Sequence, residues 1–570
     1  MKLMDLPWWQ KAVFYQIYPR SFADGNGDGI GDFQGILAKL DYLKHLGIDA
    51  IWLSPHYPSP LFDCGYDVAD YCSVAPEYGT LELFEQFLEE AHRRDLRVIL
   101  DLVLNHTSDQ HPWFLESRSS RDHPRRDWYI WRDGKNGGPP NNWYSTFGGS
   151  AWEYDPATDQ YYYHFFFKQQ PDLNWRNPEV KAAMWDAVRF WLKMGVDGFR
   201  LDAVGTIFEV EDLRGQKAPV SHDELLVMSY KAKTREEQAQ TERLWHSMFK
   251  YQVDLPEVHD LMKELRRVVD EFPGRVLVGE TEDIRFYGNG RDELHLNFNF
   301  PLMETRRITP AWVRRNQRRR LSRLPDGAWP CNTLGNHDSP RMLSRFGDGE
   351  HDREIARVNL ALILTLKGTP FLYNGEEIGM SDYLFTDVSK FRDQLGIFYY
   401  NLLKSHPDLV DPEEAALIAA RGGRDKCRTP LQWENTVNAG FSPEGVEPWL
   451  PVNPDYAQGV NVADQEADQG SLLNFYRTML RIRRENPALM AGEYEPLGTD
   501  AACLSFLRIA EEQTLLVVLN MSEKKRRLNL KVPGQMELVF SSHRSQGTEM
   551  VFEPFEVFLA ELRGVPENQA

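Results

Sequence analysis

Short apolar runs recur along the first two thirds of the chain and predict buried parallel strands. These runs lack the alternation of apolar and polar residues that marks a strand with one face in water. Continuous apolar runs are typical of strands that are covered on both faces. The eight predicted strands are Val13–Tyr18, Ala50–Ser54, Arg97–Leu104, Gly198–Asp202, Arg275–Glu280, His295–Phe298, Cys331–His337 and Pro370–Tyr373.

Amphipathic helical patterns lie between the early strands, as at Asp32–Leu46 and Leu81–Arg94. Eight strand–helix units predict an α/β fold, a closed (β/α)8 TIM barrel. Two stretches interrupt the alternation, at about residues 105–174 and 381–450, where Asp, Pro, Gly, Asn and aromatic residues are frequent. The first is predicted to be an inserted subdomain after strand 3. It would form one wall of the site, because barrel active sites lie at the strand-to-helix loops.

The last part of the chain has a different pattern. After a helical stretch at Leu472–Arg484, short strands follow one another without helices between them, which predicts a C-terminal antiparallel β domain. Its predicted strands are Leu504–Leu507, Thr514–Leu519, Arg527–Val532, Met536–Phe540 and Glu556–Leu562. The predicted domains are a barrel (1–104 and 175–490), an inserted subdomain (105–174) and a β domain (491–570).

Three carboxylates stand at or just after the ends of predicted barrel strands. They are Asp202, Glu280 and Asp338. The carboxyl ends of barrel strands meet on the face where barrel enzymes carry out their chemistry. Paired carboxylates that face one sugar are the machinery of glycoside hydrolysis. We therefore expect these three acids to converge on one site.

The residues before two of these acids indicate their roles. Arg200 stands two positions before Asp202, so both side chains point to one face of the strand, and we expect the guanidinium to lower the pKa of Asp202. The alternative is a structural Arg–Asp pair. Glu280 follows the apolar Val276–Val278, and a desolvated carboxyl suits a general acid. The alternative there is a glutamate that faces solvent at a strand end.

Polar clusters follow two further strands. Asn336-His337-Asp338 ends strand 7, and Asn105-His106 follows strand 3. Such clusters serve as substrate clamps or metal sites, whereas the alternatives are a turn for the first and a core histidine for the second. The joint position of all these residues at one end of successive strands favours a site.

The segment Asp24–Asp32 carries oxygen side chains at alternating positions, with glycines between them. This spacing suits a hard cation such as Ca²⁺. The twelfth position is Gly35 rather than Glu, so the loop is not a full EF-hand. The alternative is a turn held by Asp and Asn side chains, and in either case the loop is structural rather than catalytic.

Composition narrows the class of protein. The 570 residues carry a formal net charge of −20, which argues against nucleic acid as the main partner. The five cysteines are widely spaced with no CxxC, which argues against a disulfide framework and a zinc site. No apolar run is long enough to cross a membrane, and the N-terminus lacks a signal-like apolar stretch. We expect a cytoplasmic monomer or small homo-oligomer, with no nucleic-acid or membrane partner.

These motifs together resemble the α-amylase family of glycoside hydrolases, and within it the oligo-1,6-glucosidase and α-glucosidase branch. The resemblance extends from Trp9 to the C-terminal β domain. The motifs that carry it are Asp24–Asp32, Asp101–His106, Gln170–Trp175, Gly198–Asp202, Glu280, Asn336–Asp338 and Arg428–Trp433.

The resemblance implies a retaining mechanism on a small oligosaccharide. Asp202 would attack the anomeric carbon and form a covalent glucosyl-enzyme. Glu280 would protonate the leaving oxygen and later deprotonate water, while Asp338 would stabilise the transition state. Residues implied to hold the glucose hydroxyls and tune the nucleophile are Arg200, His106 and His337. No cofactor is implied for catalysis.

The resemblance also implies a closed pocket for one sugar. Asp63 and Arg428 would grip the non-reducing end of the glucose, which forces exo-action. Tyr66 would stack on the sugar, and Phe147 and Phe166 would line the pocket from the inserted subdomain. The implied ligands of a structural Ca²⁺ or Mg²⁺ are Asp24, Asn26, Asp28, the Ile30 carbonyl and Asp32.

One departure from the branch bears on specificity. Ala203 follows the nucleophile where strict α-1,6 enzymes usually carry Val, so we expect a preference for α-1,4 linkages, as in maltose. Two alternatives stay open. One is an isomerase or transglucosidase of the same fold, such as a trehalose synthase. The other is a non-enzymatic scaffold, which is disfavoured because all three acids are present.

Overall fold

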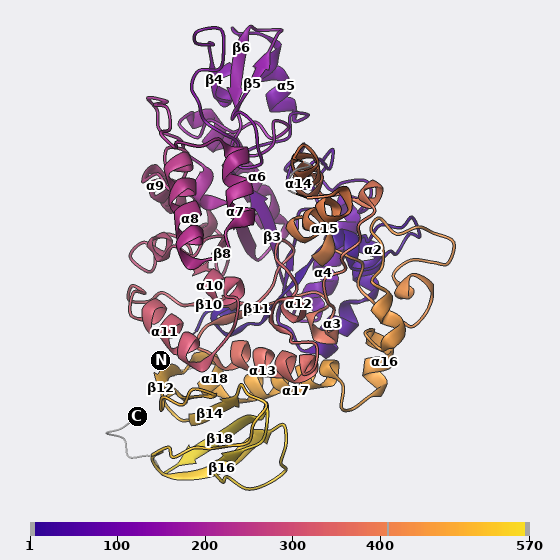
Figure 1. Cartoon of the computed structure of the whole chain (residues 1–570), viewed down its shortest axis with the longest axis vertical. Helices are drawn as coiled ribbons and strands as arrows, with labels where there is room; N and C mark the ends of the chain where they lie inside the picture. The colour runs from indigo at the N-terminus through magenta and orange to yellow at the C-terminus, as the bar shows by residue number, and fades with distance from the viewer. Residues whose placement is uncertain (1–5, 407–409, 565–570) are drawn as a thin grey trace.

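The computed structural model describes residues 6–406 and 410–564, and its centre is an eight-stranded parallel barrel (Figure 1). The first five and last six residues of the predicted domains lie outside the described residues. All eight predicted strands are confirmed. They are β1 (Phe14–Ile17), β2 (Ala50–Leu53), β3 (Arg97–Val103), β7 (Gly198–Asp202), β8 (Val276–Gly279), β9 (Leu296–Asn297), β10 (Cys331–Thr333) and β11 (Thr369–Tyr373).

The barrel strands pair in the order β10-β11-β1-β2-β3-β7-β8-β9. A parallel bridge between Phe298 and Cys331 joins the two ends of this sheet and closes the barrel. Alternate residues point inwards, as the period of a strand requires. Trp52, Ile99 and Val278 therefore belong to the core cluster inside the barrel, whereas their neighbours in sequence belong to the core under the helices.

Helices cover the outside of the barrel in the order that the sequence predicts, with two differences. The expected helix Asp32–Leu46 is broken at Lys39 into α2 (Phe33–Ala38) and α3 (Leu40–Leu46). The connection from β8 to β9 carries a 3-10 helix, η5 (Ile284–Tyr287), rather than an α-helix. The covering helices are α4 (Leu81–Arg93), α6 (Pro178–Met194), α9 (Glu257–Asp270), α11 (Pro310–Leu321), α13 (Asp352–Thr365) and α17 (Leu472–Glu485).

Residues between β3 and α6 rise above the barrel in Figure 1. They contain α5 (Pro112–Ser119) and a three-stranded antiparallel sheet made of β4 (Trp131–Arg132), β6 (Gln160–Tyr163) and β5 (Trp152–Asp155). Two helical hairpins lie in other strand-to-helix connections. They are α7 (His222–Lys231) with α8 (Arg235–Phe249), and α14 (Gln394–Lys404) with α15 (Pro412–Gly422). The second hairpin falls in the stretch 381–450, which the sequence presents only as a break.

A five-stranded antiparallel sheet forms the C-terminal part, in the order β12-β13-β14-β18-β16. Its strands are β12 (Glu493–Pro496), β13 (Cys503–Ile509), β14 (Thr514–Asn520), β18 (Val557–Arg563) and β16 (Gln535–Ser541). The expected strand Arg527–Val532 is wrong: β15 covers only Arg526–Arg527 and pairs with β17 (Val551–Phe552) in a separate ribbon. Strand β12 was not predicted, because its side chains are mostly exposed and show no apolar pattern.

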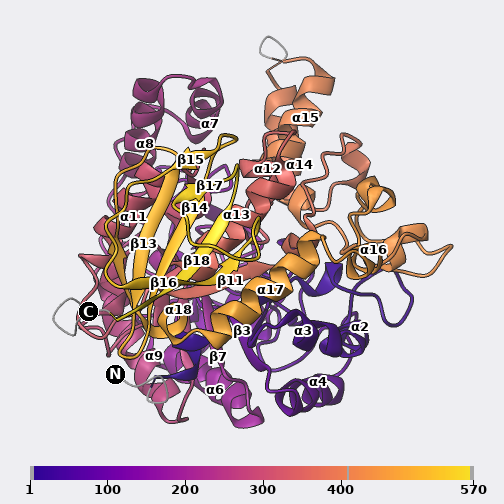
Figure 2. The ribbon, with the colours of Figure 1, turned by 90° about the horizontal axis from the view of Figure 1, so that it is seen from below.

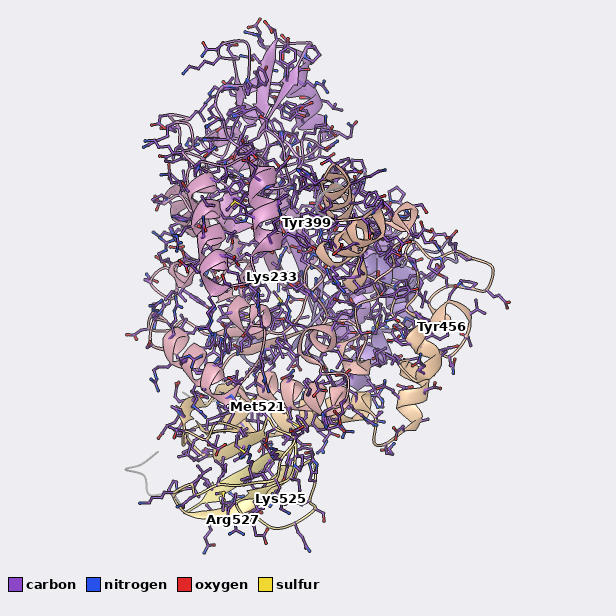
Figure 3. The ribbon with its side chains drawn as sticks, in the orientation of Figure 1. Lys233, Tyr399, Tyr456, Met521, Lys525 and Arg527 are labelled. Atoms are coloured by element: carbon purple, nitrogen blue, oxygen red, sulfur yellow. The ribbon has the colours of Figure 1, made fainter. Side chains whose placement is uncertain are left out.

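The C-terminal sheet lies against barrel helices α11, α13 and α17 (Figure 2). Met521 lies close to this junction, while Lys525 and Arg527 lie farther from the barrel (Figure 3). Buried Arg508 of β13 ties the two layers together, because it donates to the carbonyl of Thr365 at the end of α13 at 2.5 Å. Within the barrel helices, buried Arg483 of α17 donates to the carbonyl of Leu364 at 2.7 Å. The apolar cores of barrel and sheet form one continuous cluster.

No helix among the described residues is both long enough and apolar enough to cross a membrane.

Candidate active site

The ends of β3, β7 and β8 bring three acids onto one buried guanidinium. Arg200 lies on the inward face of β7, above the ring of Trp52. Its Nη1 contacts Asp101 at 2.7 Å and Asp202 at 2.8 Å, and its Nη2 contacts Glu280 at 2.8 Å. The Arg200 side chain is fully buried, whereas 13 % of Asp202 and 23 % of Glu280 remain exposed. Asp202 and Glu280 are therefore neighbours that remain partly accessible to a substrate, while buried Arg200 fixes their carboxylates.

Arg200 acts to lower the pKa of Asp202, as expected, but it does not decide the net shift. Burial, and then the charge of Glu280, raise the pKa of Asp202 well above its ordinary value despite the contact with Arg200. Burial likewise raises the pKa of Asp101 to about 6. One guanidinium shared by three carboxylates in a low-dielectric site does not offset the desolvation of each.

Asp338 follows β10 and lies beside two further arginines. Arg428 Nη2 donates to Asp338 Oδ1 at 2.5 Å, and Arg424 Nη1 is 3.6 Å from the same oxygen. Burial acts to raise the pKa of Asp338. His337 and the guanidinium groups outweigh burial, so the pKa lies below the ordinary value. Asp338 thus stays ionised where Asp202 is pushed towards protonation.

His337 connects Asp338 with the Arg200 cluster. Gln16 Nε2, which can only donate, lies 2.8 Å from Nδ1 of His337, so Nε2 of the ring carries the proton. That Nε2 is 2.5 Å from the hydroxyl of Tyr66, and the hydroxyl is 3.1 Å from Asp101 Oδ2. Burial lowers the pKa of His337 well below its ordinary value, so the imidazole is neutral.

Tyr66 packs one ring face on His337, with 5.5 Å between centroids and 13° between planes. His106 lies close by, with its Nε2 3.1 Å from the carbonyl oxygen of Tyr66 and 2.9 Å from Gln170 Nε2. Sequence-predicted residues from β2, β3 and β10 connections therefore form one continuous polar floor.

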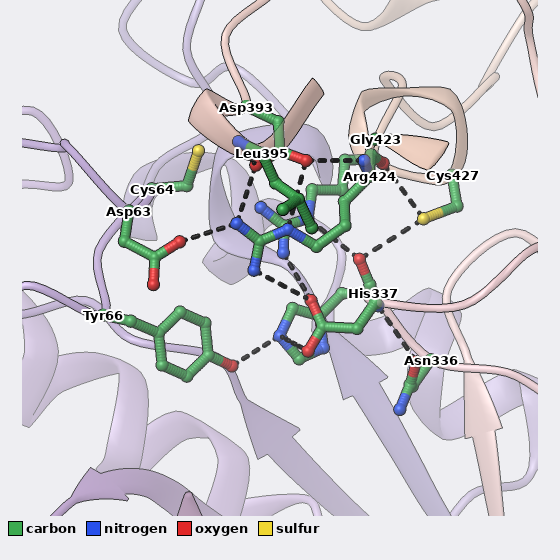
Figure 4. A network of polar contacts seen from close by, with 12 residues as sticks. Asp63, Cys64, Tyr66, Asn336, His337, Asp393, Leu395, Gly423, Arg424 and Cys427 are labelled. Carbon is green, nitrogen blue, oxygen red and sulfur yellow. Dashed lines mark hydrogen bonds and ion pairs between the residues drawn. The ribbon is translucent and has the colours of Figure 1, made fainter. Parts of the chain in front are cut away.

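Asp63 forms an ion pair with Arg424 (Figure 4), and the expected joint grip of Asp63 and Arg428 on the glucose stays a prediction. Arg424 Nη2 lies 2.6 Å from Asp63 and 2.7 Å from Asp393. Asp393 also accepts from the backbone N–H of Arg424 and caps the first turn of α14. Arg428 instead contacts Asp338 and the carbonyl of His337. Both arginines thus lie beside Asp338, and Arg424 also reaches Asp63 and Asp393.

Aromatic side chains from the segment after β3 form a wall beside these charges. The ring of Phe147 lies 5.9 Å from the guanidinium carbon of Arg424 and 5.4 Å from the ring of Phe166. Phe166 in turn packs edge-on against His106 at 5.1 Å. The structure brings both predicted phenylalanines next to the polar floor.

Four site residues were not singled out as site residues from the sequence. Asp101 and Gln170 stand inside motifs that the resemblance includes, so their signal was available. Arg424 stands four residues before Arg428, which opens a quoted motif, and nothing in the linear pattern marks Arg424 itself as a site residue. Asp393 lies in a stretch without a recognisable pattern. Long-range partners of this kind require coordinates.

The loop 24–32 is held by its own backbone. Asp24 accepts hydrogen bonds from the amides of Gly27 and Gly29, and Asp32 accepts from Gly35 and so caps α2. Within residues 6–406 and 410–564, no group of three or more His, Cys, Asp or Glu side chains is arranged to hold a metal ion. Asp24 Oδ1 and both carboxylate oxygens of Asp32 each accept two backbone N–H groups, so a cation would have to replace some of these hydrogen bonds. A cation there stays a prediction.

Comparisons with known proteins agree with this geometry. A family model for the α-amylase catalytic domain matches residues 16–492. An oligo-1,6-glucosidase of Parageobacillus thermoglucosidasius is 40 % identical over 541 residues, covering 91 % of this chain and 92 % of the relative. A probable α-glucosidase of Rhizobium meliloti is 42 % identical over 529 residues, covering 91 % and 90 %. The crystal structure of the trehalulose synthase MutB of Pseudomonas mesoacidophila MX-45 matches with TM-score 0.85 and 37 % identity, covering 98 % of this chain and 99 % of that one.

Proposed function

This chain belongs to the α-amylase family of glycoside hydrolases, and we propose that it is an exo-acting, retaining α-glucosidase. Its relatives support glucosidase activity on a carbohydrate substrate. The observation that carries the proposal is the shared grip of Arg200 on Asp202 and Glu280, at 2.8 Å each. Acids held side by side by one guanidinium suit the close pair of a retaining enzyme better than the wider pair of an inverting one.

The proposed reaction has two steps. Asp202 attacks the anomeric carbon while Glu280 gives its proton to the departing glycosidic oxygen, which leaves a glucosyl ester on Asp202. Glu280 then takes a proton from water, whose oxygen displaces Asp202 and restores both acids. Asp338 stays ionised beside Arg428 and stabilises the positive charge that develops on the sugar ring.

Exo-action is supported by the cluster of Asp63, Arg424 and Asp393. These charges form ion pairs with one another in a fixed geometry, next to Asp338. We infer that this cluster forms charge-assisted hydrogen bonds to the hydroxyls at the end of a chain and closes the pocket behind one sugar. His106, Tyr66 and the two phenylalanines complete the proposed pocket for one glucose.

The preference for α-1,4 linkages is supported by the backbone at Ala203. Its φ is 41°, a left-handed conformation in which a β-branched residue is strained. Its N–H donates to Glu280 Oε2 at 2.9 Å, so this residue directly positions the proposed acid. A small side chain leaves space beside that acid for the second sugar.

A glucosyl-transferring or isomerising enzyme is the second candidate. The likeness to a trehalulose synthase favours it, because the name of that enzyme states that it makes a sugar. The covalent intermediate is common to both reactions, so the proposed catalytic residues serve either outcome.

Product analysis on maltose, isomaltose, sucrose and trehalose tests the proposal. Faster release of glucose from maltose than from isomaltose is the expected result. Conversion of any disaccharide into an isomer with little free glucose would overturn the hydrolase assignment in favour of the second candidate. No turnover of any of the four sugars would contradict both.

A further inference from the structure

Helix α11 carries a stripe of arginines that the proposed reaction does not use. Trp312, Arg315 and Arg319 follow one another at steps of three or four residues, so their side chains share one face of the helix, and Arg323 continues this spacing two residues beyond its end at Leu321. Buried Val313 and Gln317 point to the barrel instead. The stripe is thus separate from the face that packs the helix on the strands.

This stripe forms one wall of a cavity of about 840 Å³, which we call the α11 cleft. The opposite wall is formed by the segment 281–284, which directly follows Glu280, and by Asn299 and Pro301 after β9. The volume lies in the range that binds small molecules such as sugars and their phosphates. The cleft therefore opens beside the catalytic rim but on the outer side of β8 and β9.

Three arginines that line the cleft have guanidinium groups without a protein partner among the described residues. The side chains of Arg315, Arg319 and Arg323 are exposed, and in the described part of the chain none makes a hydrogen bond or ion pair. Of the acids on the wall, Asp283 is already paired with Arg285, which leaves Asp254 and Glu282. In a chain of net charge −20, three unpaired arginines on one face indicate a local need for positive charge.

Arg320 supplies a second observation at the base of the cleft. It is only 8 % exposed, and its Nη2 donates to the Asn297 carbonyl at 2.5 Å while Nη1 lies 3.4 Å from the Glu282 carbonyl. Its Nε has no hydrogen-bond partner. A fourth, buried guanidinium thus lies behind the stripe with a donor left over.

We propose that the α11 cleft binds the phosphate group of a small molecule, either a phosphorylated sugar or free phosphate. The planar fork of arginine matches phosphate oxygens in a bidentate way, and three such forks on one helix face can surround one dianion. Trp312 at the end of the stripe offers an aromatic face to an attached sugar ring. Nucleic acid is a poor occupant, because the overall negative charge repels a polyanion.

Calorimetry on the full-length protein tests this with inorganic phosphate, glucose 6-phosphate and glucose as probes. We expect phosphate and glucose 6-phosphate to bind and glucose not to bind at this site. Arg319→Ala with Arg323→Ala should raise the dissociation constant at least tenfold. Arg318→Ala is the matched control, since Arg318 is an exposed arginine on the same helix that does not line the cleft. Circular dichroism establishes that each variant is folded.

The outcomes separate the two sources of phosphate. Tighter binding of glucose 6-phosphate than of phosphate, lost in Trp312→Ala, identifies a sugar phosphate. Equal binding of both, unchanged in Trp312→Ala, identifies free phosphate. No binding at millimolar concentration, or binding equally weakened in Arg318→Ala, overturns the proposal. Because binding is measured without turnover, this result is independent of the proposed glucosidase activity.

Discussion

Arg200 and Arg424 each hold several carboxylates, but they stand on different parts of the fold. Arg200 gathers Asp101, Asp202 and Glu280 from the ends of adjacent barrel strands. Arg424 gathers Asp63 and Asp393 from long connections after β2 and β11. Strand ends fix the reacting groups, whereas connections fix the end of the substrate. Chemistry and specificity can therefore vary separately.

The largest expected effect lies in the strand-held half. Asp202→Asn removes the nucleophile and should lower kcat by about 10⁴-fold or more, because no other group can form the covalent intermediate. Steady-state kinetics on maltose measures this, with circular dichroism as a check on folding. Asp186→Asn, an exposed acid of α6, is the matched control. Near-normal activity of Asp202→Asn would contradict the mechanism.

A smaller effect is expected in the connection-held half. Arg424→Lys keeps the charge but loses the fork to Asp63 and Asp393, so kcat/KM should fall about 10- to 100-fold, mostly through KM. Arg421→Lys, an exposed arginine at the end of α15, should change neither constant. A fall in kcat with unchanged KM would show that Arg424 acts on the reaction rather than on substrate binding.

The boundary between the halves is tested at Ala203. Ala203→Val places a β-branched side chain at positive φ beside Glu280, so kcat/KM for maltose should fall about tenfold. Isomaltose should be less affected, which would move the ratio towards α-1,6 linkages. Ala203→Gly tolerates the same φ and should keep the original ratio. If Ala203→Val left the ratio of kcat/KM for maltose and isomaltose unchanged, the size of residue 203 would not determine linkage preference.

The shared charges of the strand-held half should appear in the pH profile. Asp202 must be ionised to attack, so kcat/KM falls as pH drops through its pKa. Burial and the charge of Glu280 raise that pKa, so Glu280→Gln should move the acid limb to lower pH. Glucosyl fluoride is a suitable substrate because its leaving group needs no acid. The control Glu282→Gln should leave the limb in place.

The smallest expected effect is structural and lies outside both halves. If the loop 24–32 binds Ca²⁺ or Mg²⁺ as proposed, chelation should lower the melting temperature by about 2 °C. Asp24→Asn should remove this response while activity at 25 °C is kept. A melting temperature that neither chelator nor added cation changes would leave the loop as a turn held by its own amides.

The sequence predicted the strand-held half better than the other. Continuous apolar runs indicated all eight strands, and period two put Arg200 and Asp202 on one face. The sequence could not show which arginine forms an ion pair with Asp63, because only the short turn η8 (Asp425–Cys427) separates Arg424 from Arg428. The sign of the pKa shift at Asp202 depends on burial, which is a property of packing rather than of neighbours in sequence.

The expectations that the structure corrects concern segments without a strong pattern. The break at Lys39 interrupts a continuous helical periodicity, so only its non-helical backbone reveals it. Strand β12 at the edge of the C-terminal sheet carries mostly exposed side chains, and β15 is shorter than its β-branched and apolar neighbours suggest. Edge positions have one pairing partner and are weakly encoded.

The buried junction between barrel and C-terminal sheet limits how the two parts can be separated in evolution or by engineering. Arg508 of the sheet donates to the Thr365 carbonyl at the end of α13, and apolar residues of both parts share one core. A chain truncated at the boundary would leave the Thr365 carbonyl without its hydrogen-bond donor, Arg508. It would also expose the apolar surface of the barrel helices to water. The two parts are therefore not independent folding units. Recombination has to keep them together, and a chain shortened to its barrel would lose part of its hydrophobic core.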